Sequence, residues 1–487
     1  MRTLLTKRAI EYAWRELARR AGFALSGDGD SAIGGLGVRF HYGQPSEVSG
    51  DVPTVVVVPS EPGDWQRLVD LQERRLETMP LRHVLPIGAS PAEDRPLPVL
   101  FRGRGPRSTS DFARLDGQVL VFECDLLAST LFLLSRWEES VLTSRDNHGR
   151  IPFTDSVAHR QGFLDRPLVD EYALVLREWL KVLRPAWVPT VGRFKVQLSH
   201  DIDVIAPFGR LGRAAISLAG DLVRRKDPAR AAAGARLALM QGIAPRRTAD
   251  YEGIFRLAEI SRRHDMASAF FFMAAEPGPY DSAYDPASRP VREAIRKLED
   301  LGFETGFHAG YGTFGNPQRL AEEKSRLDAV LGRSVYGGRQ HYLRFLVPDT
   351  WRQWERLGLS YDSTLSFAGH EGFRCGTCHS YRPFDLEADR VLQIEEQPLI
   401  VMDGTLRQYR GLTASEAEMR VLELARRCRD AEGTFTLLWH NSSLAGEWAE
   451  WGLDYEGLIA KLSALEKRSN LPIPFVPETP RSGSVWR

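Results

Sequence analysis

Short apolar runs alternate with helically spaced apolar residues in the first part of the chain. The strand-like runs are residues 54–58 and 118–122, and the helix-like patterns are residues 1–20, 126–139 and 168–183. Apolar runs of this length are typical of buried strands, and apolar residues at a spacing of three and four are typical of amphipathic helices. Residues 1–190 are therefore expected to form a smaller α/β domain, and Pro185 and Pro189 mark the break in the pattern that ends it.

Seven further apolar segments alternate with helical stretches in residues 191–487, which are expected to form the second domain. They are residues 194–199, 268–273, 303–307, 335–340, 359–362, 393–402 and 433–440. This alternation favours parallel strands connected by helices, with closure into a barrel as one arrangement. In such folds the reactive groups gather at the C-terminal ends of the strands. An Ala/Arg-rich stretch, Arg224 to Arg247, is predicted to be a helical insertion without a chemical role.

The overall charge changes the list of candidate partners. The 64 basic residues balance the 64 acidic ones, so no excess charge would attract nucleic acid or anionic lipid. No segment approaches the roughly 18 consecutive apolar residues of a membrane span. The first twenty residues lack the apolar core of a secretion signal, and the four cysteines are too scattered for a disulfide framework. A cytoplasmic location is therefore expected.

Two carboxylates follow the first strand of the second domain. Asp201 and Asp203 stand in the sequence Ser199-His200-Asp201-Ile202-Asp203, directly after the apolar-rich run 194–198. Side chains two residues apart on a strand point to the same side, so both carboxylates should meet at its C-terminal edge. Two ionised carboxylates held close together repel each other, and a cation relieves that repulsion. One of them can bind a metal while the other handles a proton.

Three further residues at the ends of neighbouring strands could complete such a site. His308 and His341 could ligate a divalent ion together with Asp203, and two imidazoles with one carboxylate form a common catalytic zinc set. Taken alone, a histidine in the place of His308 is more often a hydrogen-bonded structural residue than a ligand, and the neighbouring residues favour a ligand. Arg339 would lie close enough to pair with Asp201 and keep it ionised.

His440 follows the last strand, in Leu437-Leu438-Trp439-His440-Asn441. A histidine that is not needed as a ligand, across the pocket from the metal, would suit protonation of a leaving group. The alternative is a histidine that merely caps the strand.

The ordered set of Ser-His-Asp-Ile-Asp, Gly-Phe-His, Arg-Gln-His-Tyr and Leu-Leu-Trp-His-Asn resembles the motifs of polysaccharide deacetylases of carbohydrate esterase family 4. The resemblance covers roughly residues 190–475. Within that family, the chain is most similar to a divergent branch linked to surface-polysaccharide and O-antigen synthesis. It implies a distorted (β/α)7-type barrel and one divalent ion, expected to be Zn²⁺. The implied activity is the hydrolysis of an N- or O-acetyl group from a sugar.

The resemblance also implies a role for each site residue. Asp201 resembles the general base and Asp203 the metal-binding aspartate, while His308 resembles the first histidine of the second motif. His440 resembles the general acid, and Asp403 is placed like the acid that orients it, with Asp362 as the alternative. Arg339 resembles the arginine that tunes the base, and Arg344 fits the same motif. The expected sugar-binding residues are Tyr311, Tyr342, Arg374 and Trp439.

The chain departs from the family pattern at Gly312, where a second histidine is usual. Three outcomes are open. In the first, which is the preferred hypothesis, His341 replaces the missing ligand. Alternatively, Tyr311 or water fills the place, or the metal is bound weakly or not at all. If the metal has been lost, the chain would be an inactive binder of glycans or nucleotide sugars.

A second motif points elsewhere. The attachment pattern of c-type haem is matched by Cys375-Gly376-Thr377-Cys378-His379. Attachment of this haem takes place outside the cytoplasm, and a cytoplasmic location is expected here, so we interpret the match as a chance one. A structural zinc held by Cys375, Cys378, His370 and His379 is a further alternative. The segments 135–139 and 146–150 resemble the domain that precedes this branch of deacetylases. Arg136 and Glu138 are expected to be interface or capping groups, and no role is predicted for 146–150.

Overall fold

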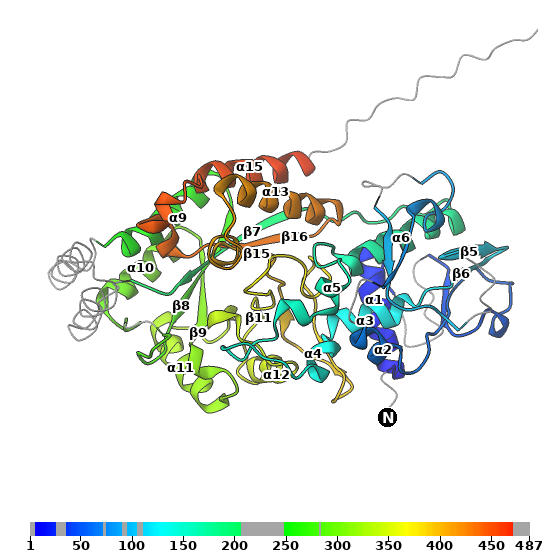
Figure 1. Ribbon diagram of the computed structural model, residues 1–487, viewed down its shortest axis with the longest axis horizontal. Coiled ribbons are helices and arrows are strands. Elements are labelled where there is room, and N and C mark those ends of the chain that lie inside the picture. Colours follow the sequence, from blue (N-terminus) through cyan, green and yellow to red (C-terminus); the bar gives the residue numbers. More distant parts are fainter. Residues whose placement is uncertain are drawn as a thin grey trace, which may run out of the picture.

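The computed structural model describes residues 5–25, 36–71, 75–89, 95–104, 111–205, 248–281 and 284–470. Figure 1 shows an elongated molecule with the N-terminal elements at one end and a larger β/α body at the other. The expected helical insertion, Arg224 to Arg247, lies outside the described residues.

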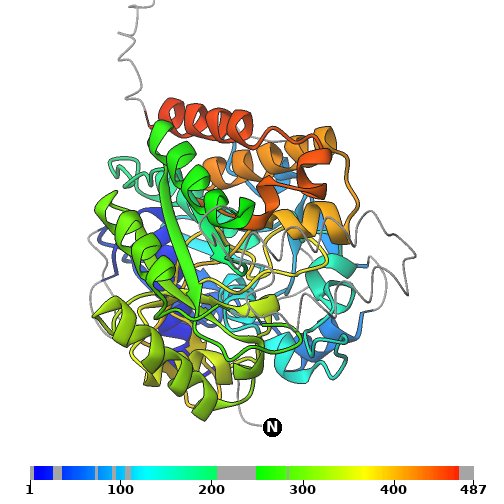
Figure 2. The ribbon, with the colours of Figure 1, turned by 90° about the vertical axis from the view of Figure 1, so that its left-hand side faces the viewer.

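The larger body is built on one parallel eight-stranded sheet. Its strands are β7 (Lys195–Ile202), β8 (Ala267–Met273), β9 (Glu304–Ala309), β10 (Gly338–Gln340), β11 (Tyr361–Asp362), β14 (Glu395–Glu396), β15 (Val401–Met402) and β16 (Thr434–Leu438). They run in the order β14-β11-β10-β9-β8-β7-β16-β15, and every pairing is parallel. All the predicted strand segments are present, and Figure 2, which shows the molecule from the barrel end, has helices around the strands.

The segment 393–402, which the sequence predicts as one strand, is two. Gln397 still donates to the carbonyl of Asp362 on one edge of the sheet, whereas Ile400 donates to the carbonyl of Thr436 near the other edge. Three residues span at most roughly 11 Å, so the two edges must lie close together. The sheet is therefore curled into a distorted barrel with eight strands and not seven.

Helices connect the strands on the outside of the barrel. They are α9 (Ala249–Arg263), α10 (Arg289–Asp300), α11 (Pro317–Leu331), α12 (Asp349–Arg356), α13 (Ala414–Asp430) and α15 (Tyr455–Ser469), with the short α14 (Glu447–Glu450) before the last. The local sequence determines where some of these helices begin. In α13, Thr413 accepts from the amide of Glu416 and the Glu416 carboxylate accepts from the amide of Thr413, which forms a capping box. The antiparallel pair β12 (Phe384–Asp385) and β13 (Arg390–Val391) lies between β11 and β14 in the chain.

The N-terminal part contains its own four-stranded sheet. Strands β1 (Arg39–Tyr42), β2 (Thr54–Val57) and β6 (Val119–Phe122) are parallel, and β5 (Ala113–Asp116) is antiparallel to β6. A separate antiparallel pair joins β3 (Glu77–Met79) and β4 (Leu97–Val99). The helices are α1 (Lys7–Ala21), α2 (Asp64–Asp70), α3 (Leu126–Leu134), α4 (Trp137–Val141), α5 (Val157–Arg160) and α6 (Leu168–Leu183). The helix predicted over 126–139 is divided, because Arg136 has a φ of 54° between α3 and α4.

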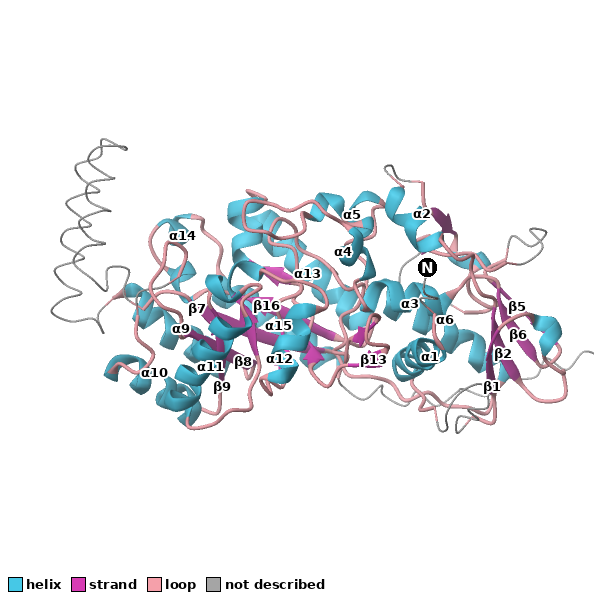
Figure 3. Ribbon diagram, turned by 90° about the horizontal axis from the view of Figure 1, so that it is seen from below, coloured by secondary structure: helices cyan, strands magenta, loops and turns pink. Residues whose placement is uncertain are grey.

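The two parts share one hydrophobic core, to which α1, α3 and α6 contribute. Figure 3 shows these helices between the small sheet and the barrel. Tyr12 of α1 packs on Phe384 of β12 with ring centroids 5.3 Å apart. Buried charge pairs reinforce the contact, among them Arg374 with Glu139 at 2.7 Å. The predicted domain boundary near residue 190 stays a prediction.

In the part of the chain that the structure describes, none of the helices has the length and apolar character that crossing a bilayer requires.

Candidate metal centre and the surrounding pocket

Asp201 and Asp203 lie at the C-terminal end of β7, and the structure gives them different partners. One oxygen of Asp201, Oδ1, accepts from Nη1 of Arg339 at 2.8 Å. Arg339 is fully buried and its other donors reach the hydroxyl of Ser199 at 3.0 Å and the carbonyl of Ser363 at 2.7 Å. Asp201 is therefore held by a fixed guanidinium, while Asp203 faces the pocket.

Asp203, His308 and His341 form a group whose ligand atoms all lie within 4.8 Å of one another. Nε2 of His308 lies 3.1 Å from Oδ1 of Asp203, and Nε2 of His341 lies 3.7 Å from Oδ2 of the same carboxylate. The residues come from β9, from the turn after β10 and from the end of β7. The three predicted ligands are thus brought together from the ends of β7, β9 and β10, although β8 lies between β7 and β9 in the sheet.

The orientation of His308 leaves a lone pair facing a carboxylate. Its Nδ1 lies 3.0 Å from the carbonyl oxygen of Arg339, which can only accept, so Nδ1 carries the hydrogen. In the neutral ring Nε2 is then an acceptor, and it faces Oδ1 of Asp203. Both atoms are buried and neither makes a hydrogen bond of acceptable geometry, in spite of the 3.1 Å between them. Two buried acceptors that face each other are an arrangement that a cation satisfies.

Asp281 is the residue of the site that the sequence analysis missed. It lies in the loop after β8, and its Oδ1 accepts from the amide of Tyr311 at 2.6 Å and from Nδ1 of His341 at 3.1 Å. Burial would raise the pKa of Asp281, but the bonds from His341 and Tyr311 outweigh it and lower that pKa. Asp281 thereby directs Nε2 of His341 toward Asp203. Its position in the sequence could have indicated it, because Asp281 follows the strand segment 268–273 and so lies at the same C-terminal edge of the sheet as the other site residues.

His440 and Asp403 form a second tight pair on the other side of Asp203. Nδ1 of His440 lies 2.7 Å from Oδ1 of Asp403, and the His440 amide donates to Oδ2 at 2.9 Å. Nε2 of His440 lies 3.6 Å from Oδ2 of Asp203. Asp362, the alternative partner, instead accepts from Thr364 and lies beside Glu396 on β14.

Charge interactions in this cluster shift the pKa values of His440, His341 and Asp203. Burial alone would lower the pKa of His440, but Asp403 and Asp203 outweigh it and raise it to about 10. In the same way, Asp203 and Asp281 overcome burial and raise the pKa of His341 to about 9. Burial would raise the pKa of Asp203, but the charges of His341 and His440 outweigh it, and the pKa falls well below its usual value.

The group opens into a pocket of about 420 Å³. Aromatic side chains from four separate segments line it, namely Tyr280, Tyr342, Tyr409 and Trp448. Arg150 from the N-terminal part lines it as well. Of the expected sugar-binding residues, Tyr342 lines this pocket, and Tyr311 lies behind Tyr280 with ring centroids 4.3 Å apart.

Two of the expected sugar-binding residues do not reach the pocket. Arg374 is buried, and its guanidinium pairs with Glu139 and donates to the carbonyl of Ser366 at 2.8 Å. Trp439 is in the core, packed on Tyr455 with centroids 4.8 Å apart. Their sequence neighbourhood suggested the rim, but both side chains point into the protein.

The structure also separates the two arginines that fit the base-tuning motif. Arg344 makes no contact with Asp201 and donates instead to the carbonyls of His148 at 2.7 Å and Tyr311 at 2.6 Å. At the position of the missing family histidine, a Cβ on Gly312 would lie 2.5 Å from the guanidinium carbon of Arg319. A side chain there would require Arg319 to move.

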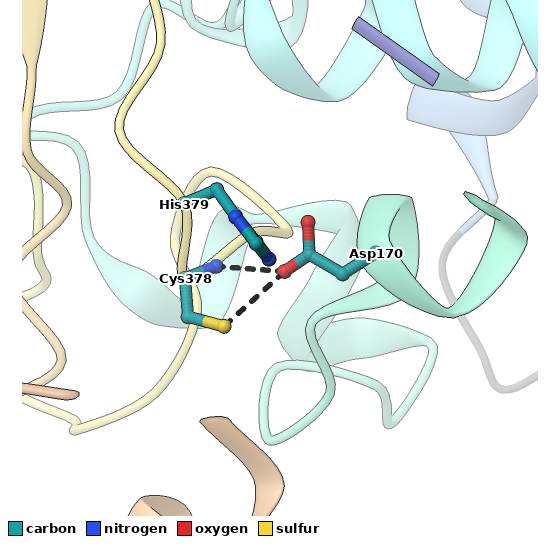
Figure 4. A group of neighbouring side chains, drawn as sticks. All are labelled: Asp170, Cys378 and His379. Atoms are coloured by element: carbon teal, nitrogen blue, oxygen red, sulfur yellow. Dashed lines mark hydrogen bonds between the residues drawn. The ribbon is translucent and has the colours of Figure 1, made fainter. Parts of the chain in front are cut away.

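A second group of potential ligands, Asp170, Cys378 and His379, lies between the two parts (Figure 4). Asp170 is already satisfied, because Oδ1 accepts from Arg20 at 2.8 Å and Oδ2 accepts from the Cys378 amide at 2.9 Å. Burial raises the pKa of the Cys378 thiol well above its usual value, so it does not ionise readily. Among the described residues, neither candidate group includes Cys375 or His370, so the structure does not gather the four ligands of the proposed structural zinc.

The fold and the site together define a distorted parallel β/α barrel with a candidate His₂Asp metal centre. Residues 72–185 match the model of a family of unknown function, DUF7033. The comparison with curated proteins finds no match.

Three solved structures resemble the chain distantly, each over 57% of its length. A candidate polysaccharide deacetylase from Mycobacterium smegmatis is 17% identical, with a TM-score of 0.37 over 87% of that protein. A mutant of a pseudoenzyme of carbohydrate esterase family 4, with restored enzymatic activity, is 13% identical, with a TM-score of 0.27 over 65% of its length. A candidate glycoside hydrolase/deacetylase from Parabacteroides distasonis is 12% identical, with a TM-score of 0.31 over 68% of its length.

Proposed function

We propose that this protein is a metal-dependent hydrolase that removes an N- or O-acetyl group from a sugar in surface-polysaccharide biosynthesis. The observation that carries the proposal is the facing pair of buried acceptors, Nε2 of His308 and Oδ1 of Asp203, with His341 beside them. A cation would satisfy all three. The two imidazoles and one carboxylate are a donor set that suits zinc and leaves positions open for a substrate.

A divalent ion bound there would polarise the acetyl carbonyl and make a water molecule more acidic. Asp201 would accept the proton of the attacking water. Its Oδ1 is occupied by Arg339, whereas Oδ2 lies 3.8 Å from Nε2 of His308, at the edge of the candidate metal site. The fixed guanidinium holds the carboxylate in one orientation, which is what a general base requires.

His440 would supply the second proton. Water adds its oxygen to the acyl carbon, the bond from that carbon to the sugar nitrogen or oxygen breaks, and the leaving atom takes a proton from Nε2 of His440. Asp403 holds the ring through Nδ1 and favours its protonated form, which a general acid requires. The products are acetate and the free amine or hydroxyl of the sugar.

The aromatic lining supports a sugar as substrate. Tyr280, Tyr342, Tyr409 and Trp448 border the same pocket as Asp203 and His440, and aromatic rings pack well on the apolar faces of sugars. If the protein works in the cytoplasm, as its sequence predicts, a nucleotide- or lipid-linked sugar is a more accessible substrate than a finished polymer. Acetate release from a panel of both kinds of compound tests this, and activity restricted to extracellular polymer would contradict it.

Metal analysis of protein purified without added zinc tests the central proposal. We expect close to one divalent ion per chain, and loss of both the ion and acetate release in Asp203→Ala and His308→Ala. His264→Ala serves as a matched control, because His264 lies after α9 near Glu456 and far from this site in the chain. Protein that holds no metal yet binds acetylated sugars, with no effect of these substitutions, would identify it instead as a glycan or nucleotide-sugar binder.

A further inference from the structure

A turn of the N-terminal part lies directly against the loop that carries the candidate ligand His341. We call residues 146–150 the clamp turn. Arg150 lines the same pocket as Asp203 and His341, although it precedes the barrel by more than forty residues in the chain. No catalytic role in the proposed reaction uses this turn.

The loop after His341 has a conformation that its residues do not favour by themselves. Tyr342 has a φ of 61° and Leu343 a φ of 53°, and neither is glycine. Positive φ values in two consecutive bulky residues are costly, and such a conformation persists only when the surroundings hold it. Because these residues directly follow His341, whatever holds them also fixes the direction of its imidazole.

The clamp turn supplies that support from both sides of the loop. Nη1 of Arg150 donates to the carbonyl of Tyr342 at 2.9 Å, and Nε of Arg344 donates to the carbonyl of His148 at 2.7 Å. The ring of His148 also packs on the ring of Tyr342, with centroids 4.8 Å apart. The strained residues are thus enclosed between two hydrogen bonds to one turn.

The same turn also reaches Tyr311, since Nδ1 of His148 lies 3.3 Å from the hydroxyl oxygen of that residue. Arg344, which donates to the carbonyl of His148, joins the same group of contacts. Arg344 donates to the carbonyl of Tyr311 at 2.6 Å, and its guanidinium carbon lies 3.9 Å from the centroid of that ring. The amide of Tyr311 in turn donates to Asp281, the partner of Nδ1 of His341. The loops after β8, β9 and β10 are therefore joined into one network beside the clamp turn.

The clamp turn is itself rigid. Oδ1 of Asp146 accepts from the amides of His148 at 2.8 Å and Arg150 at 2.9 Å, and Oδ2 accepts from Nε of Arg150 at 2.8 Å. Gly149 has a φ of 75°, which glycine adopts without strain. A turn fixed by its own aspartate can hold a neighbouring loop without first having to be ordered.

We infer that the clamp turn is a positioning element of the metal site, through which the N-terminal part sets the direction of His341. This inference rests on the metal site of the proposed function. It gives the region that contains the turn a role in metal binding that no comparison assigns. Arg150 and His148 are positioning residues in this account, because they act on the metal through the loop.

Titration of the full-length chain with Co²⁺ alone tests the inference, by competition with a chelator and by visible absorption. In Arg150→Gln we expect about tenfold weaker binding, as is usual when a partner that orients a ligand is lost, together with an altered Co²⁺ spectrum. Arg150→Lys, which keeps a donor, should recover part of both. Arg145→Gln is the matched control, since Arg145 is exposed in the same segment and donates only to the carbonyls of Leu142 and Ser144.

The outcomes separate this inference from the proposed function. If wild-type protein binds no Co²⁺, the proposed metal site is wrong. If wild type binds and His308→Ala does not, but Arg150→Gln and His148→Ala keep the wild-type affinity and spectrum, the clamp turn has no positioning role and the inference is overturned. His148→Ala provides an independent variant should Arg150→Gln fail to fold.

Discussion

Asp281 accepts a hydrogen bond from Nδ1 of His341 at 3.1 Å and so determines which nitrogen of that ring faces Asp203. Its second partner, the amide of Tyr311, fixes the carboxylate in place. Metal-binding histidines are usually oriented by a carboxylate or carbonyl on the nitrogen that does not bind the metal. His308 has the same arrangement with the carbonyl of Arg339. Both imidazoles are therefore prepared to present Nε2.

We expect Asp281→Ala to weaken metal binding by about 10- to 100-fold, because the ring of His341 loses the group that orients it. Isothermal titration with Zn²⁺ measures the change. Asp285→Ala is the control, since Asp285 is exposed in the same loop and its carboxylate accepts from the nearby amide of Ala287. Equal affinities in wild type and Asp281→Ala would show that His341 is not a ligand.

Replacing His440 with glutamine should separate catalysis from metal binding. We expect acetate release to fall by about 10²- to 10⁴-fold, because the leaving atom loses its proton donor, while one ion per chain is retained. Asp403→Asn should produce a loss of the same kind, because the ring loses the charge that keeps it protonated. Loss of metal together with activity in His440→Gln would indicate that His440 is a ligand and not an acid.

Arg374→Met should destabilise the fold and leave the sugar site intact. The substitution leaves the carboxylate of Glu139 with Arg136 but without its second buried partner. Breaking a buried pair costs about 3–5 kcal/mol, which urea unfolding measures. Arg382→Met, in an exposed arginine that contacts Gln393, should stay within about 0.5 kcal/mol. If Arg374→Met instead raised the KM for the sugar and left the stability unchanged, the sequence prediction that Arg374 binds sugar would be supported.

Asp362 should make stability depend on pH in the acidic range. Burial raises its pKa from 3.8 to about 6 in spite of hydrogen bonds from Thr364. The folded protein therefore keeps a proton that the unfolded chain releases, so stability decreases as pH rises through this window and levels off above pH 6. The linked change is on the order of 3 kcal/mol. Relative to wild type, Asp362→Asn should thus gain up to about that amount between pH 4 and pH 7. An offset that does not vary with pH would contradict the assignment.

The sequence was sufficient to place the strands and the groups at their C-terminal ends. Buried parallel strands are marked by apolar runs, and residues that follow such runs must meet at one edge of the sheet. That rule brought Asp203, His308 and His341 together without any knowledge of the helices between them. It also placed Asp403 and His440 at that edge, while their pairing was implied by the family resemblance, with Asp362 as the alternative. The structure makes β15 and β16 neighbours and so brings Asp403 to His440.

What the sequence did not reveal depends on contacts between distant segments. Asp281 lies in an irregular loop, where no periodicity points to its partner His341, 60 residues away. Glu139 and Arg374 are separated by 235 residues, so the burial of that pair could not be read from either neighbourhood. The split of segment 393–402 was hidden as well, since a continuous apolar run does not show where the backbone changes its pairing partner.

Strands β14 and β15 are the two edges of the sheet and do not pair with each other. The seam between them is closed by the chain that connects them. The short connection from Gln397 to Ile400 keeps the two edges together, so a covalent tether closes the barrel where no ladder hydrogen bonds join the strands. Each edge strand is only two residues long. Such short borders offer little template for a foreign strand and so protect an incomplete barrel against aggregation.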